Sequence, residues 1–230
     1  MSQRNTVVYL VTFSAIAAAM IVAVSWQQFS IAPSPGLLDR LLVGSVFIAS
    51  CVFGISLAIR PGWTRRLIAG KSDEVSRELA QVRGRRGHHP DCEYFDSHTI
   101  RWGDRTLCAG CTGLAAGSIL SILLMSLYVA LPTELPVGVL QALLVLGLAL
   151  VAAKYVETVL PLDRAYARLI SNGLFIVGFS LLVVGAFVLS GSTVFGILGV
   201  VMSFLFLDTR IQLSRWRHTK TCRDCSEDCK

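Results

Sequence analysis

The grouping of apolar residues is the feature that most constrains this chain, because it requires lipid as the surrounding solvent. Of 230 residues, 53% are hydrophobic and 16% are charged, whereas about a quarter of an average soluble domain is charged. Five runs contain no ionisable residue and approach the roughly 20 residues that a membrane-spanning helix needs. They are Val7 to Val24, Leu41 to Ile59, Leu114 to Leu131, Val137 to Ala153 and Leu169 to Leu189.

A sixth apolar run, Val194 to Leu207, has only 14 residues, and we interpret it as a short sixth span. The first run is long for a signal peptide, and Pro33 follows the small residues near its end, so we expect an uncleaved helix. The sequence therefore predicts an all-α integral membrane bundle of about six transmembrane helices. Residues 1–59 form helices 1 and 2, residues 60–111 a loop, residues 112–207 helices 3 to 6, and residues 208–230 a tail.

The distribution of basic residues predicts which side of the membrane each connection faces. Six spans place the N-terminus, the long loop, the turn after the fourth span and the tail on one side. That side carries all but one of the 21 Lys and Arg residues, and Arg40 alone lies on the other. Because basic residues collect on the cytoplasmic side, we expect a multi-pass protein of the cell membrane with both termini in the cytoplasm.

The formal charge of +6 has the same origin. Arg83, Arg85 and Arg86 form a basic cluster, but positive-inside topology and attraction to anionic headgroups account for it. We therefore expect the lipid bilayer, with a protein partner at the cytoplasmic face, and we do not expect nucleic acid. The sequence does not specify an oligomeric state.

The long loop carries the pattern of a zinc module. His89 and Cys92 stand two residues apart, and after fifteen more residues Cys108 and Cys111 repeat that spacing, as in a zinc ribbon. Cytoplasmic thiols rarely form lasting disulfides, so metal or redox chemistry is the better interpretation. His88 and His98 are rival ligands. Thr112 is a candidate cap of the third span, which would place Cys111 at the positive end of that helix.

Two further segments frame this module. Lys71 to Val82 has the pattern of a short amphipathic helix. The tail supplies a second candidate set of zinc ligands, for which an iron–sulfur cluster is less favoured because the usual cysteine spacing is missing. This set consists of His218, Cys222, Cys225 and Cys229. Cys51, alone in the second span, is interpreted as a small buried apolar residue.

The segment Cys108-Ala109-Gly110-Cys111-Thr112-Gly113, followed by Gly117, resembles an uncharacterised family of prokaryotic membrane proteins with a Cys-Ala-x-Cys-Thr-Gly signature. The resemblance covers about 30 residues, from His88 to Gly117. The Cys-His order differs from the family's pattern, and Gly110 stands where Arg is usual. The resemblance implies a metal-binding type of Cys/His module joined to membrane helices, and it implies no reaction.

The spans themselves give little indication of catalysis or ion transport. They contain no ionisable residue, and we interpret Lys154 and Glu157 as a snorkelling lysine in an interfacial ion pair. Gly113 and Gly117 are spaced for close helix packing. We expect a membrane-anchored interaction or regulatory protein with a structural zinc site, more readily than an enzyme. The alternative is a membrane thiol oxidoreductase or metal-handling protein that uses Cys108, Cys111 and the tail cysteines.

The topology can be tested by thiol labelling in intact cells. We expect a membrane-impermeant thiol reagent to leave Cys92 and Cys225 unmodified until the membrane is permeabilised, because both lie on the basic side. Modification of either cysteine from outside would contradict the predicted orientation.

Overall fold

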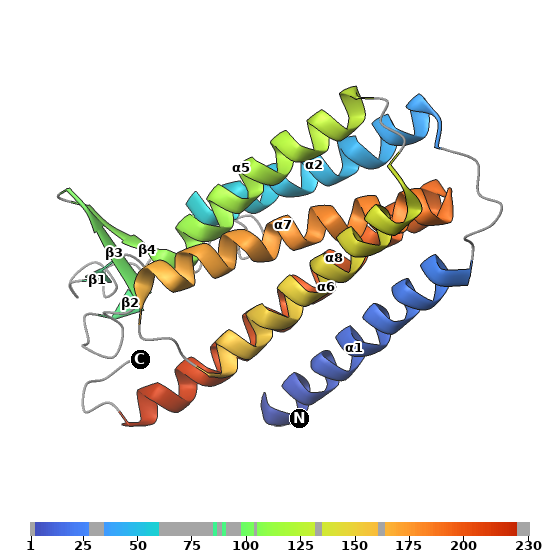
Figure 1. Cartoon of the computed structure of the whole chain (residues 1–230). Coiled ribbons are helices and arrows are strands. Elements are labelled where there is room, and N and C mark those ends of the chain that lie inside the picture. The colour runs from blue at the N-terminus through green and yellow to red at the C-terminus, as the bar shows by residue number, and fades with distance from the viewer. Residues whose placement is uncertain are drawn as a thin grey trace, which may run out of the picture.

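A computed structural model shows six long helices gathered in one bundle (Figure 1). It describes residues 3–27, 35–59, 85–86, 89–90, 98–103, 105–131, 135–160 and 164–224. Each of the six helices is long and apolar enough to cross a membrane, so the predicted six-helix, multi-pass architecture is confirmed. The helices are α1 (Gln3–Gln27), α2 (Leu37–Ile59), α5 (Ala109–Ala130), α6 (Val137–Val159), α7 (Ala165–Ser190) and α8 (Thr193–Asp224).

The sixth helix is much longer than the apolar run that predicted it. Its apolar stretch extends over Thr193–Arg217, and the helix continues without a break across the predicted boundary after Leu207. The residues from 208 to 224 include neither Gly nor Pro, so nothing in them ends a helix. The part of the tail that the structure describes is therefore a continuation of α8.

The loop contains strands that the sequence analysis did not predict. β1 (Arg85–Arg86) pairs with β2 (His89–Pro90), and β3 (Thr99–Trp102) pairs with β4 (Arg105–Cys108), both antiparallel. A two-residue turn joins β3 to β4, and Gly103 adopts the positive φ of 58° that such hairpin turns require. The predicted amphipathic helix at Lys71 to Val82 lies outside the described residues.

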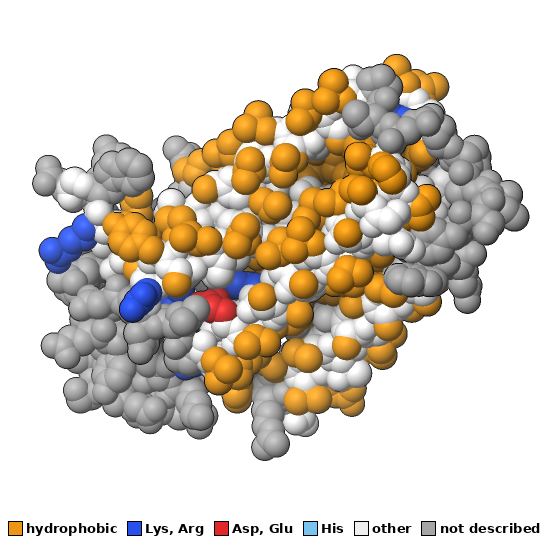
Figure 2. Space-filling view, viewed as in Figure 1, with side chains coloured by type: hydrophobic (Ala, Val, Ile, Leu, Met, Phe, Trp, Pro, Cys, Tyr) orange, Lys and Arg blue, Asp and Glu red, His pale blue; other side chains and the backbone are white. Residues whose placement is uncertain are grey.

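Helix α7 forms the centre of the bundle, with α2 and α5 on one side and α6 and α8 on the other (Figure 1). It is by far the most buried of the six helices. Its aromatic side chains Phe175 and Phe179 are in ring contact, and Phe179 stacks on Phe206 of α8. The surface of the bundle is covered with apolar side chains (Figure 2), as expected of helices whose outer faces contact lipid. Cys51 is buried in this core, as predicted.

The contact between α5 and α7 depends on glycine. A Cβ atom on Gly117 would lie 2.5 Å from the carbonyl oxygen of Gly173, and one on Gly113 would collide with the backbone at Leu169. The predicted role of Gly113 and Gly117 in close packing is therefore confirmed. This packing brings the start of α5 directly onto α7, at the end of the bundle where the strands lie (Figure 1).

Replacing Gly117 with Ala tests this contact. We expect the variant to lose about 1–3 kcal/mol of stability, because the added methyl group forces α5 away from α7. Thermal unfolding in detergent measures the change. The matched control is Gly138→Ala, since a Cβ atom there meets nothing within 4 Å, and it should be neutral or slightly stabilising. Equal stabilities for the two variants would contradict the close contact.

Candidate functional site

Cys108 and Cys111 lie together where the β3–β4 hairpin joins the membrane. Cys108 is the last residue of β4 and the N-cap of α5, in an extended conformation with φ −71° and ψ 119°. Cys111 follows in the first turn of the helix. The two thiols are free, half-buried and hydrogen-bonded to each other. The sequence thus placed the pair correctly at the start of a membrane helix.

The predicted capping role of Thr112 is wrong. The helix begins three residues earlier than expected, at Ala109, and Cys108 occupies the N-cap position without a side-chain hydrogen bond to the backbone. Thr112 lies inside the helix and donates its hydroxyl hydrogen bond to the carbonyl oxygen of Cys108 at 2.9 Å. Cys111 is therefore near the positive end of the helix, as predicted, but by a different arrangement.

Helices α7 and α8 supply polar groups next to the thiols. A Cβ atom on Gly110 would lie 3.5 Å from Arg210 Nη2, 3.7 Å from Cys108 Sγ and 3.9 Å from Asn172 Nδ2. A guanidinium, a thiol and an amide from three different elements therefore surround one point. Arg210 also interacts electrostatically with both cysteines.

Asn172 links these groups to the rest of the bundle. Its side chain is only 1% exposed. Its Oδ1 accepts a hydrogen bond from Arg210 Nη2 at 2.8 Å, and its Nδ2 donates to the carbonyl oxygen of Arg168 at 2.5 Å. The amide thus holds the guanidinium in place between α7 and α8, as interhelical amides do in membrane proteins.

Lys154 and Glu157 of α6 form an ion pair directed toward α7. Lys154 Nζ donates to Ser171 Oγ at 3.0 Å, and Ser171 Oγ donates to the Glu157 carboxylate at 3.2 Å. The predicted ion pair is confirmed, but the snorkelling interpretation is wrong, because Lys154 is only 3% exposed and turns into the helix interface. We refer to the five side chains of Lys154, Glu157, Ser171, Asn172 and Arg210 as the polar layer.

The members of the polar layer and the cysteine pair lie at one level along the bundle. Lys154 and Arg210 each lie 17 residues from the far end of their helix, Asn172 lies 18 and Cys111 lies 19. At 1.5 Å per residue these positions are about 25–29 Å from the opposite end. Since the hydrocarbon core is about 30 Å thick, the layer marks the boundary between hydrocarbon and headgroups.

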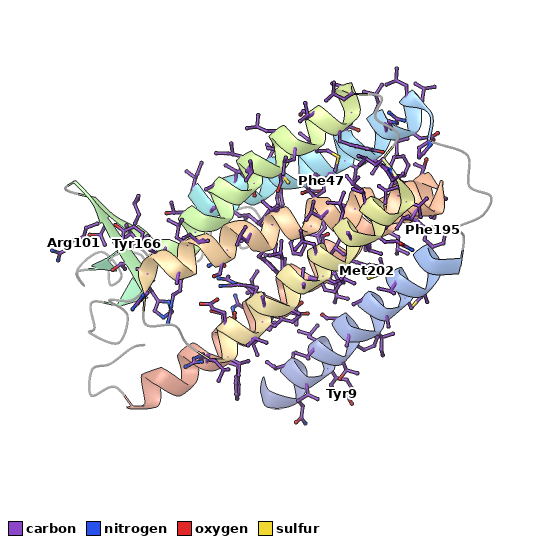
Figure 3. All side chains as sticks on the ribbon, in the orientation of Figure 1. Tyr9, Phe47, Arg101, Tyr166, Phe195 and Met202 are labelled. Atoms are coloured by element: carbon purple, nitrogen blue, oxygen red, sulfur yellow. The ribbon has the colours of Figure 1, made fainter. Side chains whose placement is uncertain are left out.

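The polar layer carries an excess of positive charge. Lys154 and Arg210 contribute two cations, and Glu157 contributes one anion. Among the described residues, the buried Nε of Arg210 has no hydrogen-bond acceptor. In Figure 2 a carboxylate with basic nitrogen atoms behind it is visible in a hollow of the otherwise apolar surface, and Figure 3 shows nitrogen-bearing side chains gathered between α7 and α6 near the strands.

The comparisons with known proteins leave the site to be interpreted from its own geometry. No protein-family model, curated protein or solved structure matches the chain. The resemblance to the uncharacterised membrane-protein family therefore still rests on the motif around Cys108 and Cys111.

The other predicted ligands are described only in part. His88, Cys92, Cys225 and Cys229 lie outside the described residues, as do the side chains of His89, His218 and Cys222. Among the side chains that the structure describes, no group of three or more His, Cys, Asp and Glu gathers around a common point. The His89 backbone lies in β2, which pairs with β1, and β1 contacts β4 just before Cys108.

His98, one of the rival ligands, has a different partner. Its ring lies against α7, where Arg168 Nη1 contacts both ring nitrogens, with Nδ1 at 2.7 Å. A metal ion would compete with this guanidinium for the ring. The contact therefore favours His89 or His88 as the histidine ligand of the loop.

Sequence reasoning missed the part that α8 plays. Arg210 was counted among the cytoplasmic tail residues because the apolar run ends at Leu207, and nothing in a hydropathy pattern distinguishes a buried arginine from an exposed one. The signal that could have found it is helical periodicity, since Phe206, Thr209 and Leu213 are also buried at helical spacing.

The ion pair of the polar layer can be tested by comparing single and double replacements. We expect Glu157→Leu to cost about 3–5 kcal/mol, because it leaves the ammonium group of Lys154 buried without a counter-charge. The double variant Lys154→Met/Glu157→Leu should lie close to the wild type, since an apolar pair of similar volume removes both charges. Thermal unfolding in detergent measures both. A single variant as stable as the wild type would show that the pair is not buried.

Proposed function

We propose that this chain is a membrane-anchored interaction or regulatory protein whose loop binds one structural zinc ion at the cytoplasmic end of the bundle. The ligands are Cys92, Cys108, Cys111 and a histidine, with His89 preferred. The observation that carries the proposal is the pairing of the Cys108 and Cys111 thiols at the junction of the hairpin and α5.

The donor set fits zinc. Three thiolates and one imidazole close a tetrahedral shell, and a shell closed by four protein ligands is typical of structural rather than catalytic zinc. One ligand pair precedes the β3–β4 hairpin and the other lies at the start of α5, so one ion would tie the hairpin to the membrane helix. The short hairpins alone bury little apolar surface, and metal binding would supply the stability that they lack.

Such a site gives the interaction role a physical basis. Zinc would hold the hairpins rigidly over the end of the bundle, with the exposed Arg101 of β3 pointing away from it (Figure 3). A rigid, basic platform on the cytoplasmic side suits an acidic protein partner. The orientation itself rests on the basic residues of the loops and the tail.

A membrane thiol oxidoreductase is the second candidate function. It is favoured by one specific observation, the pair of hydrogen-bonded thiols beside the Arg210 guanidinium at a helix N-terminus, which is an environment that activates cysteine. In that case Cys108 and Cys111 would cycle between dithiol and disulfide and would hold no metal.

The tail is a separate proposal. His218, Cys222, Cys225 and Cys229 provide the ligands for a second zinc ion, which the loop variants described next would leave in place.

Elemental analysis of the purified protein tests the proposed function. We expect Cys108→Ser/Cys111→Ser to lose one zinc ion per chain, because two of its four ligands are gone. The control is Cys51→Ser, which alters a buried cysteine far from the loop and should keep the wild-type zinc content. Full metal retention in the double variant, or a metal-free wild type with a reversible Cys108–Cys111 disulfide, would overturn the proposal.

A further inference from the structure

We infer that Arg210 of α8 is the counter-charge of the cysteine centre, and that the centre is an anionic set of three thiolates and one imidazole around zinc. This inference rests on the proposed function and deepens it. It assigns a positioning role to a residue in a membrane helix and limits the loop site to a single histidine.

The geometry provides the first step. Arg210 Nη2 and Cys108 Sγ both approach the same point above Gly110, at 3.5 Å and 3.7 Å. Gly110 has no side chain to separate them, so the guanidinium and the sulfur face each other across the glycine. The hydrogen bond from Arg210 to Asn172 fixes the guanidinium there without neutralising it.

The charge balance provides the second step. The polar layer holds two cations and one anion at the edge of the hydrocarbon, which leaves one positive charge uncompensated. An unpaired buried charge is strongly unfavourable. Within the described residues, Arg210 Nε is buried without an acceptor, so the guanidinium still has a donor available for an anionic group.

Only one of the available zinc centres balances this charge. Zinc with three thiolates and one neutral imidazole carries a net charge of −1, which matches the excess of +1. Zinc with two thiolates and two imidazoles is neutral and would leave the excess unchanged. The loop has three cysteines, so a four-thiolate centre cannot form from it. The charges therefore favour Cys92, Cys108, Cys111 and one histidine.

Outer partners of metal ligands typically change metal affinity by 10–100-fold when they are replaced. Because Arg210 is rooted in α8 and Asn172 in α7, the zinc centre would be held against two membrane helices in addition to the start of α5. Replacing the charge should therefore weaken zinc binding even though Arg210 is not itself a ligand.

The test measures zinc affinity by competition with a chromophoric chelator, using the full-length protein in detergent. Arg210→Gln removes the charge but keeps an amide that can hydrogen-bond to Asn172, and Arg210→Lys keeps the charge. We expect Arg210→Gln to weaken zinc binding about tenfold or more and Arg210→Lys to weaken it less. The control is Arg215→Gln, which makes the same charge change at an exposed position of the same helix and should leave the affinity unchanged.

The possible failures can be told apart. Wild-type affinity in Arg210→Gln, or equal losses in the Gln and Lys variants, would overturn the counter-charge while leaving the zinc site in place. A wild-type protein that takes up no zinc would overturn the proposed function and this inference together. Helix content and elution as a single species verify that each variant is folded.

Discussion

The close approach of α5 and α7 at Gly113, Gly117 and Gly173 determines the arrangement at the strand end of the bundle. Because these glycines let the two backbones touch, the first turn of α5 lies directly over Asn172. Asn172 in turn holds Arg210 of α8, and the two thiols lie beside that guanidinium. A larger residue at any of these glycines would separate the cysteines from the polar groups that now adjoin them.

The second constraint is the cost of charge at the edge of the hydrocarbon. Lys154 and Glu157 meet it by pairing with each other and with Ser171 on α7. Arg210 has only Asn172 as a hydrogen-bond partner among the described residues, and ionisable groups at this depth tend to be functional. A structural zinc–thiolate centre accounts for this arginine and for the spacing of the loop cysteines with a single ion.

Much of the architecture could be predicted from the sequence, because lipid imposes a strong and simple pattern on each span. The number of helices, the packing role of Gly113 and Gly117 and the position of Cys108 and Cys111 all follow from apolar runs and spacing. The hairpin from Thr99 to Cys108 could not be predicted as easily, since four-residue strands give a weak pattern next to long helices. The burial of Lys154 and Arg210 depends on which helix faces which. That is a property of tertiary packing, and an apolar run does not report it.

Zinc K-edge X-ray absorption on the purified, full-length protein tests the central claim most directly, because it identifies the atoms bound to the metal. A centre formed by Cys92, Cys108, Cys111 and one histidine should give about three sulfur neighbours at about 2.3 Å and one nitrogen at about 2.0–2.1 Å. A tail centre with three cysteines and one histidine would give the same shell. A shell of nitrogen and oxygen alone, or a protein without zinc, would contradict the account.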